Sequence, residues 1–224
     1  MGAPDIRPLP RGPHRLDREV ILASQRGRML EAMAESVAEK GYAATTVADV
    51  VGRAGVSRKT FYEHFTDKED CFLAAYDACV DVLMTRVVDA RGEITNWGES
   101  MRASLRAYLE VLASEPTLAR TFLVEVLAAG PRALERRTEV HRRFADLSRN
   151  LHEQARRDHP DLPELPDSVF DAMVGAINEL VFELVRQGRS AELPSLEPAI
   201  FYMQLAVFAG HDRARALFAD GDPV

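Results

Sequence analysis

Residues 46–65 read TVADVVGRAGVSRKTFYEHF, and this stretch decides the fold. Thr46 followed by Asp49 is typical of a helix N-terminus, because the hydroxyl accepts a backbone N–H and the acid lies in the positively polarised first turn. Apolar residues then recur at helical spacing and predict one buried stripe: Val47, Val50, Val51 and Ala54. Gly55 tolerates the left-handed conformation that a tight turn needs, and Ser57 is a natural cap for a following helix. The stretch therefore predicts two short helices joined by a tight turn.

The second of these helices is expected to have one apolar side and one polar side. Phe61 and Phe65 lie four residues apart and should point toward a core. The other faces carry side chains that can reach base edges or phosphates: Arg58, Lys59, Thr60, Tyr62 and His64. A short basic helix is often only a solvated face. Here the cap, the apolar stripe, the glycine turn and the basic face occur in order, which favours a helix-turn-helix with this helix in the DNA major groove.

With its flanks, over about residues 20–85, this stretch resembles the DNA-binding domain of the TetR family of bacterial transcription regulators. The family pattern has a glycine and an aromatic before a Thr-rich entrance, then G-V-S-x-x-T-[FL]-Y-x-[HY]-F, then D-K-x-x-[LF]. The matching residues are Gly41, Tyr42, Thr45, Thr46, Gly55, Val56, Ser57, Thr60, Phe61, Tyr62, His64, Phe65, Asp67, Lys68, Glu69 and Phe72.

The resemblance implies a DNA-contacting set of eight residues: Thr46, Ser57, Arg58, Lys59, Thr60, Tyr62, His64 and Lys68. In this set, Thr46 and Lys68 would bind phosphates. Thr66 and Glu69 also form a predicted capping box at the start of the next helix. The positive end of that helix, together with Lys68, suits a phosphate on physical grounds as well.

The charge of the chain bounds how it could bind DNA. The net charge of −7 argues against indiscriminate nucleic-acid binding. Residues 1–75 hold 11 basic and 11 acidic residues, so the acidity lies in the remainder and any attraction to DNA must be local. Residues 1–17, rich in proline and arginine, are predicted to form a flexible arm, which is either disordered or reaches along DNA.

Cys71 and Cys79 are the only cysteines. They lie eight residues apart on one predicted helix and cannot bridge each other across that distance. They are interpreted as small apolar core residues of a protein in a reducing cytoplasm. The sequence has no signal-peptide pattern and no run of 18 apolar residues, so a cytoplasmic location without a membrane span is expected.

The rest of the chain predicts helices punctuated by proline and glycine, with no strand-like alternation. The expected helices cover residues 18–40, 67–90, 97–114, 117–129, 132–157, 168–187 and 197–218, with loops at 159–167 and 188–196. An all-α fold follows. It comprises the arm at residues 1–17, a three-helix helix-turn-helix domain at 18–66, and a larger helical ligand-binding and dimerisation domain at 67–224, joined by the long helix from residue 67.

The predicted helices at residues 168–187 and 197–218 are apolar around most of their circumference. Such a helix needs burial on more than one side. The resemblance implies that these two helices supply half of a four-helix interface in a homodimer, whereas a deep single-chain core is the alternative. A dimer also fits DNA, because two recognition helices about 34–36 Å apart can read successive major grooves of a palindrome.

The resemblance further implies a small-molecule pocket in the larger domain. The candidate lining residues are Trp97, Met101, Leu105, Tyr108, Phe122, Glu125, Phe144, Met173, Ile177, Asn178 and Phe182. Aromatic and methionine side chains at helical spacing are more often plain core, and Glu125 could equally be solvated or paired with an arginine. An apolar or aromatic effector is expected.

Motifs of enzymes are incomplete in this sequence. Gly98 and Ser100 begin a nucleophile-elbow pattern, but Arg102 stands where its second glycine belongs. His152 begins a zinc-protease pattern, but Arg156 replaces its second histidine. No catalytic residue, metal or cofactor is therefore expected. The preferred interpretation is a dimeric, ligand-responsive repressor that an effector releases from a palindromic operator; the alternative is a helical partner-binding protein without DNA binding.

Overall fold

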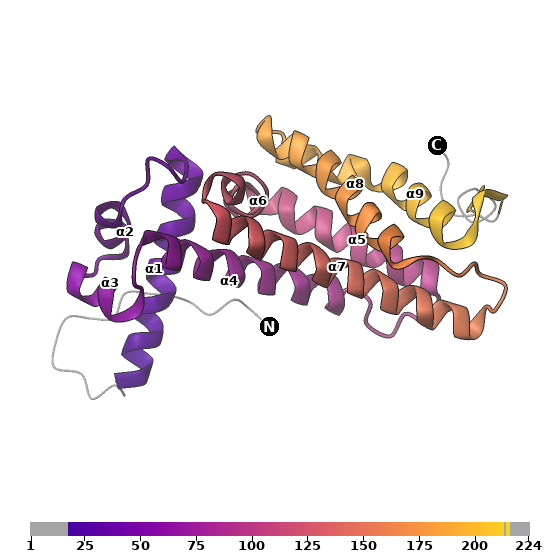
Figure 1. Ribbon diagram of the computed structural model, residues 1–224, viewed down its shortest axis with the longest axis horizontal. Coiled ribbons are helices and arrows are strands. Elements are labelled where there is room, and N and C mark those ends of the chain that lie inside the picture. Colours follow the sequence, from indigo (N-terminus) through magenta and orange to yellow (C-terminus); the bar gives the residue numbers. More distant parts are fainter. Residues whose placement is uncertain (1–17, 213, 216–224) are drawn as a thin grey trace. The chain divides into compact units, whose positions relative to one another are not determined.

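The computed structural model describes residues 18–212 and 214–215, and within these residues the regular structure is helical, with no strand (Figure 1). This confirms the predicted all-α class. The chain divides into two compact units, Met1–Cys79 and Val80–Val224. The boundary falls inside α4 (Lys68–Asp89), so this helix contributes to both units. The predicted arm at residues 1–17 lies outside the described residues.

The first unit contains α1 (Arg18–Lys40), α2 (Val47–Ala54), α3 (Arg58–His64) and the first half of α4. The predicted helix at residues 18–40 is confirmed, and it packs against α2. The core side chains are almost completely buried: Met29, Met33, Val37, Val50, Phe61, Phe65, Phe72 and Tyr76. These residues come from all four helices, so one apolar core holds the short α2 and α3 in place.

The ends of α2 and α3 are capped as the sequence predicts. Thr46 Oγ1 accepts from the Asp49 N–H at 3.3 Å, and Asp49 Oδ2 accepts from the Thr46 N–H at 2.8 Å. Gly55 ends α2 with φ 65° and ψ 36°, in the left-handed region. Ser57 Oγ accepts from the Thr60 N–H at 3.0 Å. Helices of this length are marginal alone, so the caps and the buried core supply their stability.

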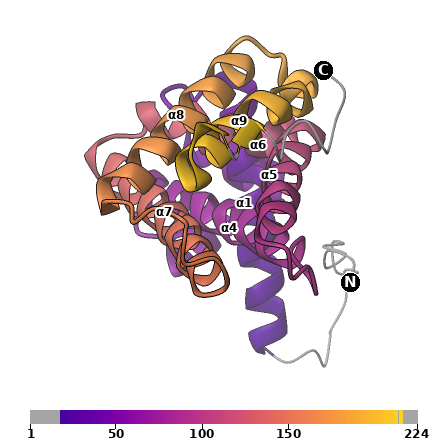
Figure 2. The same cartoon turned by 90° about the vertical axis from the view of Figure 1, so that its right-hand side faces the viewer.

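The second unit contains the rest of α4 and seven further elements: α5 (Trp97–Ser114), α6 (Pro116–Leu123), η1 (Glu125–Ala128), α7 (Pro131–Asp158), α8 (Asp167–Arg186), η2 (Ser190–Leu196) and α9 (Glu197–Ala209). In the end-on view, α5, α7, α8 and α9 surround a common interior (Figure 2). Within this bundle α7 packs along α8, and α5 packs against both α9 and η2. The cavity described below lies in this interior, and α4 and α6 also contribute to its wall.

Two prolines begin helices as predicted, because Pro116 and Pro131 occupy first-turn positions where a missing N–H costs nothing. The single helix predicted for residues 117–129 is wrong. α6 ends at Leu123, and a short 3-10 helix, η1, follows. This change of geometry lets Val126 be fully buried and lets Glu125 pair with Arg120 at 2.9 Å.

The C-terminal part differs from the sequence prediction in two places. The loop predicted at residues 188–196 is wrong for most of its length, because η2 forms there with Leu193 fully buried. The helix predicted at 197–218 forms as α9 up to Ala209 and is interrupted at Gly210. α9 stops at Gly210, whose φ of 82° breaks the helical path, and residues 211–212 and 214–215 are helical again. Residues 213 and 216–218 lie outside the described part.

Both cysteines lie on α4 and carry free thiols. Burial raises the pKa of the Cys71 thiol to about 12 and that of the Cys79 thiol to about 11. A thiol with a raised pKa carries little thiolate at neutral pH, which lowers its reactivity; Cys71 is a buried core residue and Cys79 is half-buried.

None of the described helices combines the length and the apolar content that crossing a bilayer requires.

Candidate functional sites

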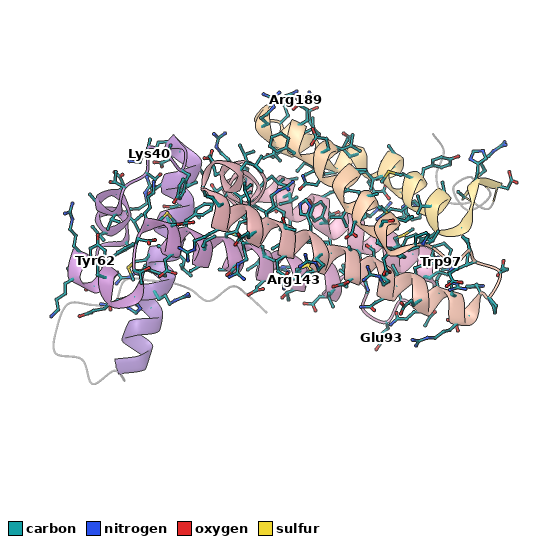
Figure 3. The ribbon with its side chains drawn as sticks, in the orientation of Figure 1. Lys40, Tyr62, Glu93, Trp97, Arg143 and Arg189 are labelled. Carbon is teal, nitrogen blue, oxygen red and sulfur yellow. The ribbon has the colours of Figure 1, made fainter. Side chains whose placement is uncertain are left out.

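The exposed side of α3 is the first candidate site. Phe61 and Phe65 are 0% and 3% exposed and anchor the helix. Arg58, Lys59 and Tyr62 lie on the solvent side, and Tyr62 is 59% exposed; Figure 3 shows it on the outer side of α3. A phenol ring exposed to this extent contributes little to the core, so its position suits contact with another molecule.

The two cations of α3 differ in their surroundings but both are available for binding. Arg58 has no hydrogen-bond or ion-pair partner among residues 18–212 and 214–215. Lys59 Nζ lies 4.0 Å from Glu63 Oε1, and its side chain is 89% exposed. An exposed pair at this distance is worth little, roughly 0.3–0.5 kcal/mol, so it hardly restrains the lysine.

The hydroxyl groups near the turn are already engaged within the protein. Thr46 Oγ1 donates to Asp49 Oδ2 at 2.6 Å, which uses its only proton. Ser57 Oγ and Thr60 Oγ1 lie 2.9 Å apart and share a hydrogen bond. The predicted phosphate contact of Thr46 would therefore require its hydroxyl to leave Asp49.

Lys68, the other predicted phosphate ligand, is half-buried. Its Nζ donates to the Tyr42 carbonyl at 2.9 Å and lies 4.1 Å from the centroid of the Tyr42 ring. Burial lowers the pKa of the Lys68 amine. One of its three N–H donors thus fixes the turn that joins α1 to α2, and the other two remain for a second acceptor.

The start of α4 is capped differently from the sequence prediction. The Thr66 N–H donates to Asp70 Oδ2 at 2.9 Å, so the acceptor is one residue beyond the predicted Glu69. Asp67 Oδ1 accepts from the Asp70 N–H at 2.8 Å and acts as the cap. The sequence has acidic residues at positions 67, 69 and 70, and the position at which α4 begins determines which of them caps the helix.

His64, also predicted to face DNA, is half-buried. Its Nε2 atom is enclosed and has no hydrogen-bond partner among the described residues. Its ring centroid lies 6.2 Å from that of Phe65. The histidine therefore lies at the edge between the core and the exposed side of α3.

Ion pairs that the sequence analysis missed tie α2 to α1. Arg53 Nη1 lies 3.0 Å from Glu35 Oε2, and the same guanidinium also pairs with Glu39. Lys40 Nζ lies 2.6 Å from Asp49 Oδ1. Hydrogen bonds from Lys40 and Thr46 hold the pKa of Asp49 well below its usual range. These contacts orient α2, on which α3 depends.

The second candidate site is a cavity inside the second unit. Its empty volume is about 740 Å³, which includes the space at its open mouth. Seven of the eleven predicted pocket residues line it: Met101, Leu105, Tyr108, Phe122, Phe144, Ile177 and Asn178. Ten lining residues were not predicted: Val87, Arg91, Ser104, His141, Leu147, Ser148, Leu151, Val174, Gln204 and Phe208. The wall is mostly apolar with a few polar groups, as ligand cavities are.

Four predicted residues lie elsewhere than in the cavity wall. Trp97 stacks on Phe208 at 6.4 Å between ring centroids. Glu125 pairs with Arg120, Met173 is buried, and Phe182 is half-buried. Apolar spacing along a helix marks an inward side chain but does not distinguish a cavity wall from a filled core.

The polar groups of the cavity come from four helices and one turn. Arg91 Nε donates to Ser104 Oγ at 2.9 Å, and Ser104 Oγ donates to the Val87 carbonyl at 3.1 Å. Burial, with Arg137 nearby, lowers the pKa of His141, while a hydrogen bond with Asn178 opposes that shift. Gln204 is 7% exposed, and its Oε1 has no hydrogen-bond partner among the described residues.

The outer surfaces of α8 and α9 bear on the predicted dimer. Leu180 on α8 is 45% exposed, whereas Val181 and Val185 on the same helix are buried. Met203 and Val207 on α9 are half-buried. Apolar side chains thus remain at the surface of both helices in the single chain.

Part of the sequence is similar to a known protein family and to a curated relative. Residues 29–75 match the family model described as bacterial regulatory proteins, tetR family. The HTH-type transcriptional activator FasR of Mycolicibacterium smegmatis is 30% identical over 103 residues, which are 46% of this chain and 47% of that protein. The chain thus matches about half the length of this curated relative.

Solved structures share the fold over most of the chain. The fatty acid degradation regulator FadR from Bacillus halodurans superposes with a TM-score of 0.73 at 20% identity, over 81% of this chain and 94% of that one. FadR from Bacillus subtilis, solved in complex with stearoyl-CoA, gives a TM-score of 0.73 at 17% identity, over 81% and 98%. At such identities the likeness establishes the helical architecture.

Proposed function

Since this chain belongs to the TetR family of bacterial regulatory proteins through its residues 29–75, we propose that it is a dimeric DNA-binding transcription regulator that responds to a small molecule. The observation that carries the proposal is the exposed side of α3, where Arg58, Lys59 and Tyr62 face outward from a helix anchored by Phe61 and Phe65. A capped helix that presents exposed cations is suited to the major groove.

Within the proposed interface the residues have different tasks. Arg58 and Lys59 contact base edges, and Tyr62 contacts the backbone, because these side chains are exposed. Ser57, Thr60 and His64 border the same side of α3. Thr46 and Lys68 bind phosphates beside the groove. We divide the chain accordingly into a DNA-binding domain at residues 18–66 and a ligand-binding and dimerisation domain at 67–224.

We further propose a homodimer through residues 168–187 and 197–218. Leu180, Met203 and Val207 support this part of the proposal, because a second copy would cover apolar area that one chain leaves at the surface. A two-fold dimer would present two α3 helices to a palindromic operator, with half-sites one helical turn, about 34–36 Å, apart.

The effector is proposed to enter the cavity of the second unit. The lining supports an apolar or aromatic molecule, and the FadR structure from Bacillus subtilis contains stearoyl-CoA, a molecule with a long apolar chain. We propose that the protein is a repressor that the effector releases from DNA. FasR is named an activator. Whether this protein represses or activates is therefore tested by in vitro transcription from a promoter that carries the operator.

The decisive experiment measures binding of the purified protein to DNA upstream of its own gene, with salt titrated. Sequence-dependent binding by a dimer, with a footprint over a near-palindrome, supports the proposal. If no sequence binds in a genomic selection, with or without a panel of apolar effectors, the proposal fails and a helical partner-binding protein takes its place.

A further inference from the structure

Arg91 in the cavity wall is a cation without a carboxylate partner. It lies in the turn after α4, and its Nε donates to the neutral hydroxyl of Ser104 at 2.9 Å. Ser104 is held in turn by the Val87 carbonyl at 3.1 Å. Within the described part of the chain no acidic group pairs with this guanidinium, and burial is the one cause that lowers its pKa.

Other guanidinium groups of the second unit show what Arg91 lacks. Four of them pair with a carboxylate: Arg102 with Glu197, Arg120 with Glu125, Arg143 with Asp81, and Arg149 with Asp167. The contrast matters because a charge taken out of water without a partner is unfavourable. A bound anion would therefore stabilise the Arg91 guanidinium at this position.

The hydrogen bond to Ser104 leaves the two Nη groups of Arg91 available for a ligand. Ser104 engages only Nε, so the two Nη groups keep their four N–H donors. A guanidinium presents these donors as a planar fork that matches a carboxylate. The remaining wall is largely apolar, with Met101, Leu105 and Phe144 among its members.

We propose that Arg91 anchors the anionic head group of the effector, so that the effector is an amphipathic carboxylate whose apolar chain lies against the cavity wall. This inference rests on the proposed effector role of the cavity. Gln204, whose buried Oε1 also has no partner among the described residues, offers a second polar contact, to a donor on the ligand. A neutral hydrocarbon would leave the Arg91 guanidinium without an anion.

A purely structural role for Arg91 makes a different prediction. A cation just beyond the C-terminus of α4 interacts favourably with the negative end of the helix dipole. Loss of such a role would lower stability and weaken all ligands alike. Loss of an anion anchor would weaken anionic ligands selectively, so ligand discrimination separates the two roles.

The test is a calorimetric titration of the full-length protein with three probes of equal chain length: dodecanoate, methyl dodecanoate and dodecanoyl-coenzyme A. The variants are Arg91→Met, Arg91→Lys and, as a matched control, Arg86→Met. Arg86 is exposed in the last turn of α4 and does not line the cavity. Binding of methyl dodecanoate and the melting temperature report whether each variant is folded.

We expect the wild type and Arg86→Met to bind dodecanoate at least about tenfold more tightly than its methyl ester. Arg91→Met should abolish this preference while it still binds the ester, and Arg91→Lys should retain part of it. Dodecanoyl-coenzyme A could instead bind more tightly than dodecanoate, with this advantage lost in Arg91→Met. Arg91 would then still be the anchor, but the anion that it binds would be a phosphate of coenzyme A and the carboxylate assignment would be overturned.

Equal binding of acid and ester by the wild type overturns the inference, as does an unchanged preference in Arg91→Met. Failure of all three probes to bind would overturn the effector role of the cavity and this inference with it. Operator binding is measured separately on the same samples, so the DNA-binding part of the proposed function is judged independently.

Discussion

Replacing Gly55 by alanine tests the turn that sets α3 against α2. Gly55 has φ 65° and ψ 36°, a conformation that costs residues with a β-carbon about 1–2 kcal/mol. An added Cβ would meet no atom closer than Arg28 Nη1 at 4.0 Å, so no clash contributes. Alanine also lowers the conformational entropy of the unfolded chain, which offsets about 0.4–1 kcal/mol of this cost. We therefore expect Gly55→Ala to destabilise the first unit by roughly 1 kcal/mol.

Gly52 provides a matched control one turn earlier in the chain. It lies within α2, is exposed, and a Cβ there would meet nothing within 4 Å. Because alanine is the better helix former, Gly52→Ala should stabilise the unit by about 0.5–1 kcal/mol. The same substitution is therefore expected to lower the stability of the first unit at Gly55 and to raise it at Gly52, three residues earlier.

The assay is native-state hydrogen exchange, read by mass spectrometry on peptides from α2 and α3. Protection reports the local opening free energy, so it isolates the first unit from the rest of the chain. Protection should fall in Gly55→Ala and rise in Gly52→Ala. A neutral or stabilising Gly55→Ala would refute the left-handed turn as a requirement of this fold.

Three further predictions concern the first unit. Lys68→Ala should weaken binding to all DNA sequences alike and lower the salt slope by about one unit; an unchanged slope would contradict its phosphate role. Arg58→Ala and Lys59→Ala should relax sequence preference in a binding selection; if both lose only general affinity, neither reads bases. Asp49→Asn should lower thermal stability at neutral pH. Because the folded pKa of Asp49 is lowered, its stabilisation is present above its unfolded pKa of about 3.9 and disappears as pH falls toward the folded value. The difference between Asp49→Asn and the wild type should therefore shrink from pH 5 to pH 3, and a constant difference would contradict the charge-based explanation.

Features encoded over three or four residues could be predicted from the sequence. Thr46 with Asp49, Gly55, and the first-turn prolines Pro116 and Pro131 act through local hydrogen bonds and backbone angles. Their consequences do not depend on the rest of the fold. Both ends of α2 and the starts of α3, α6 and α7 follow from such signals, which is why they were predictable.

Features that depend on tertiary packing were not predictable in this way. Arg91, His141 and Gln204 are polar residues that sequence alone would place in solvent, yet the bundle brings them to the cavity wall. Conversely, Trp97 and Met173 have the spacing of lining residues but fill the core. Helical periodicity distinguishes inside from outside, and the difference between wall and core arises only when helices distant in sequence meet.

The intramolecular contacts of the proposed interface also decide which residues can add affinity for DNA. Thr46 and Lys68 already donate to Asp49 and Tyr42, at 2.6 and 2.9 Å. A phosphate bond from Thr46 would replace an existing bond, and exchange of equivalent bonds yields little net free energy. Lys68 keeps its charge and two N–H donors, so the free energy that it gains from binding a phosphate is mainly electrostatic. Arg58 has no such contact to release within the described part of the chain. Its bond to a base edge would replace only bonds to water and would break none within the protein, and for this reason α3, more than the phosphate ligands that flank it, should determine which sequence is bound.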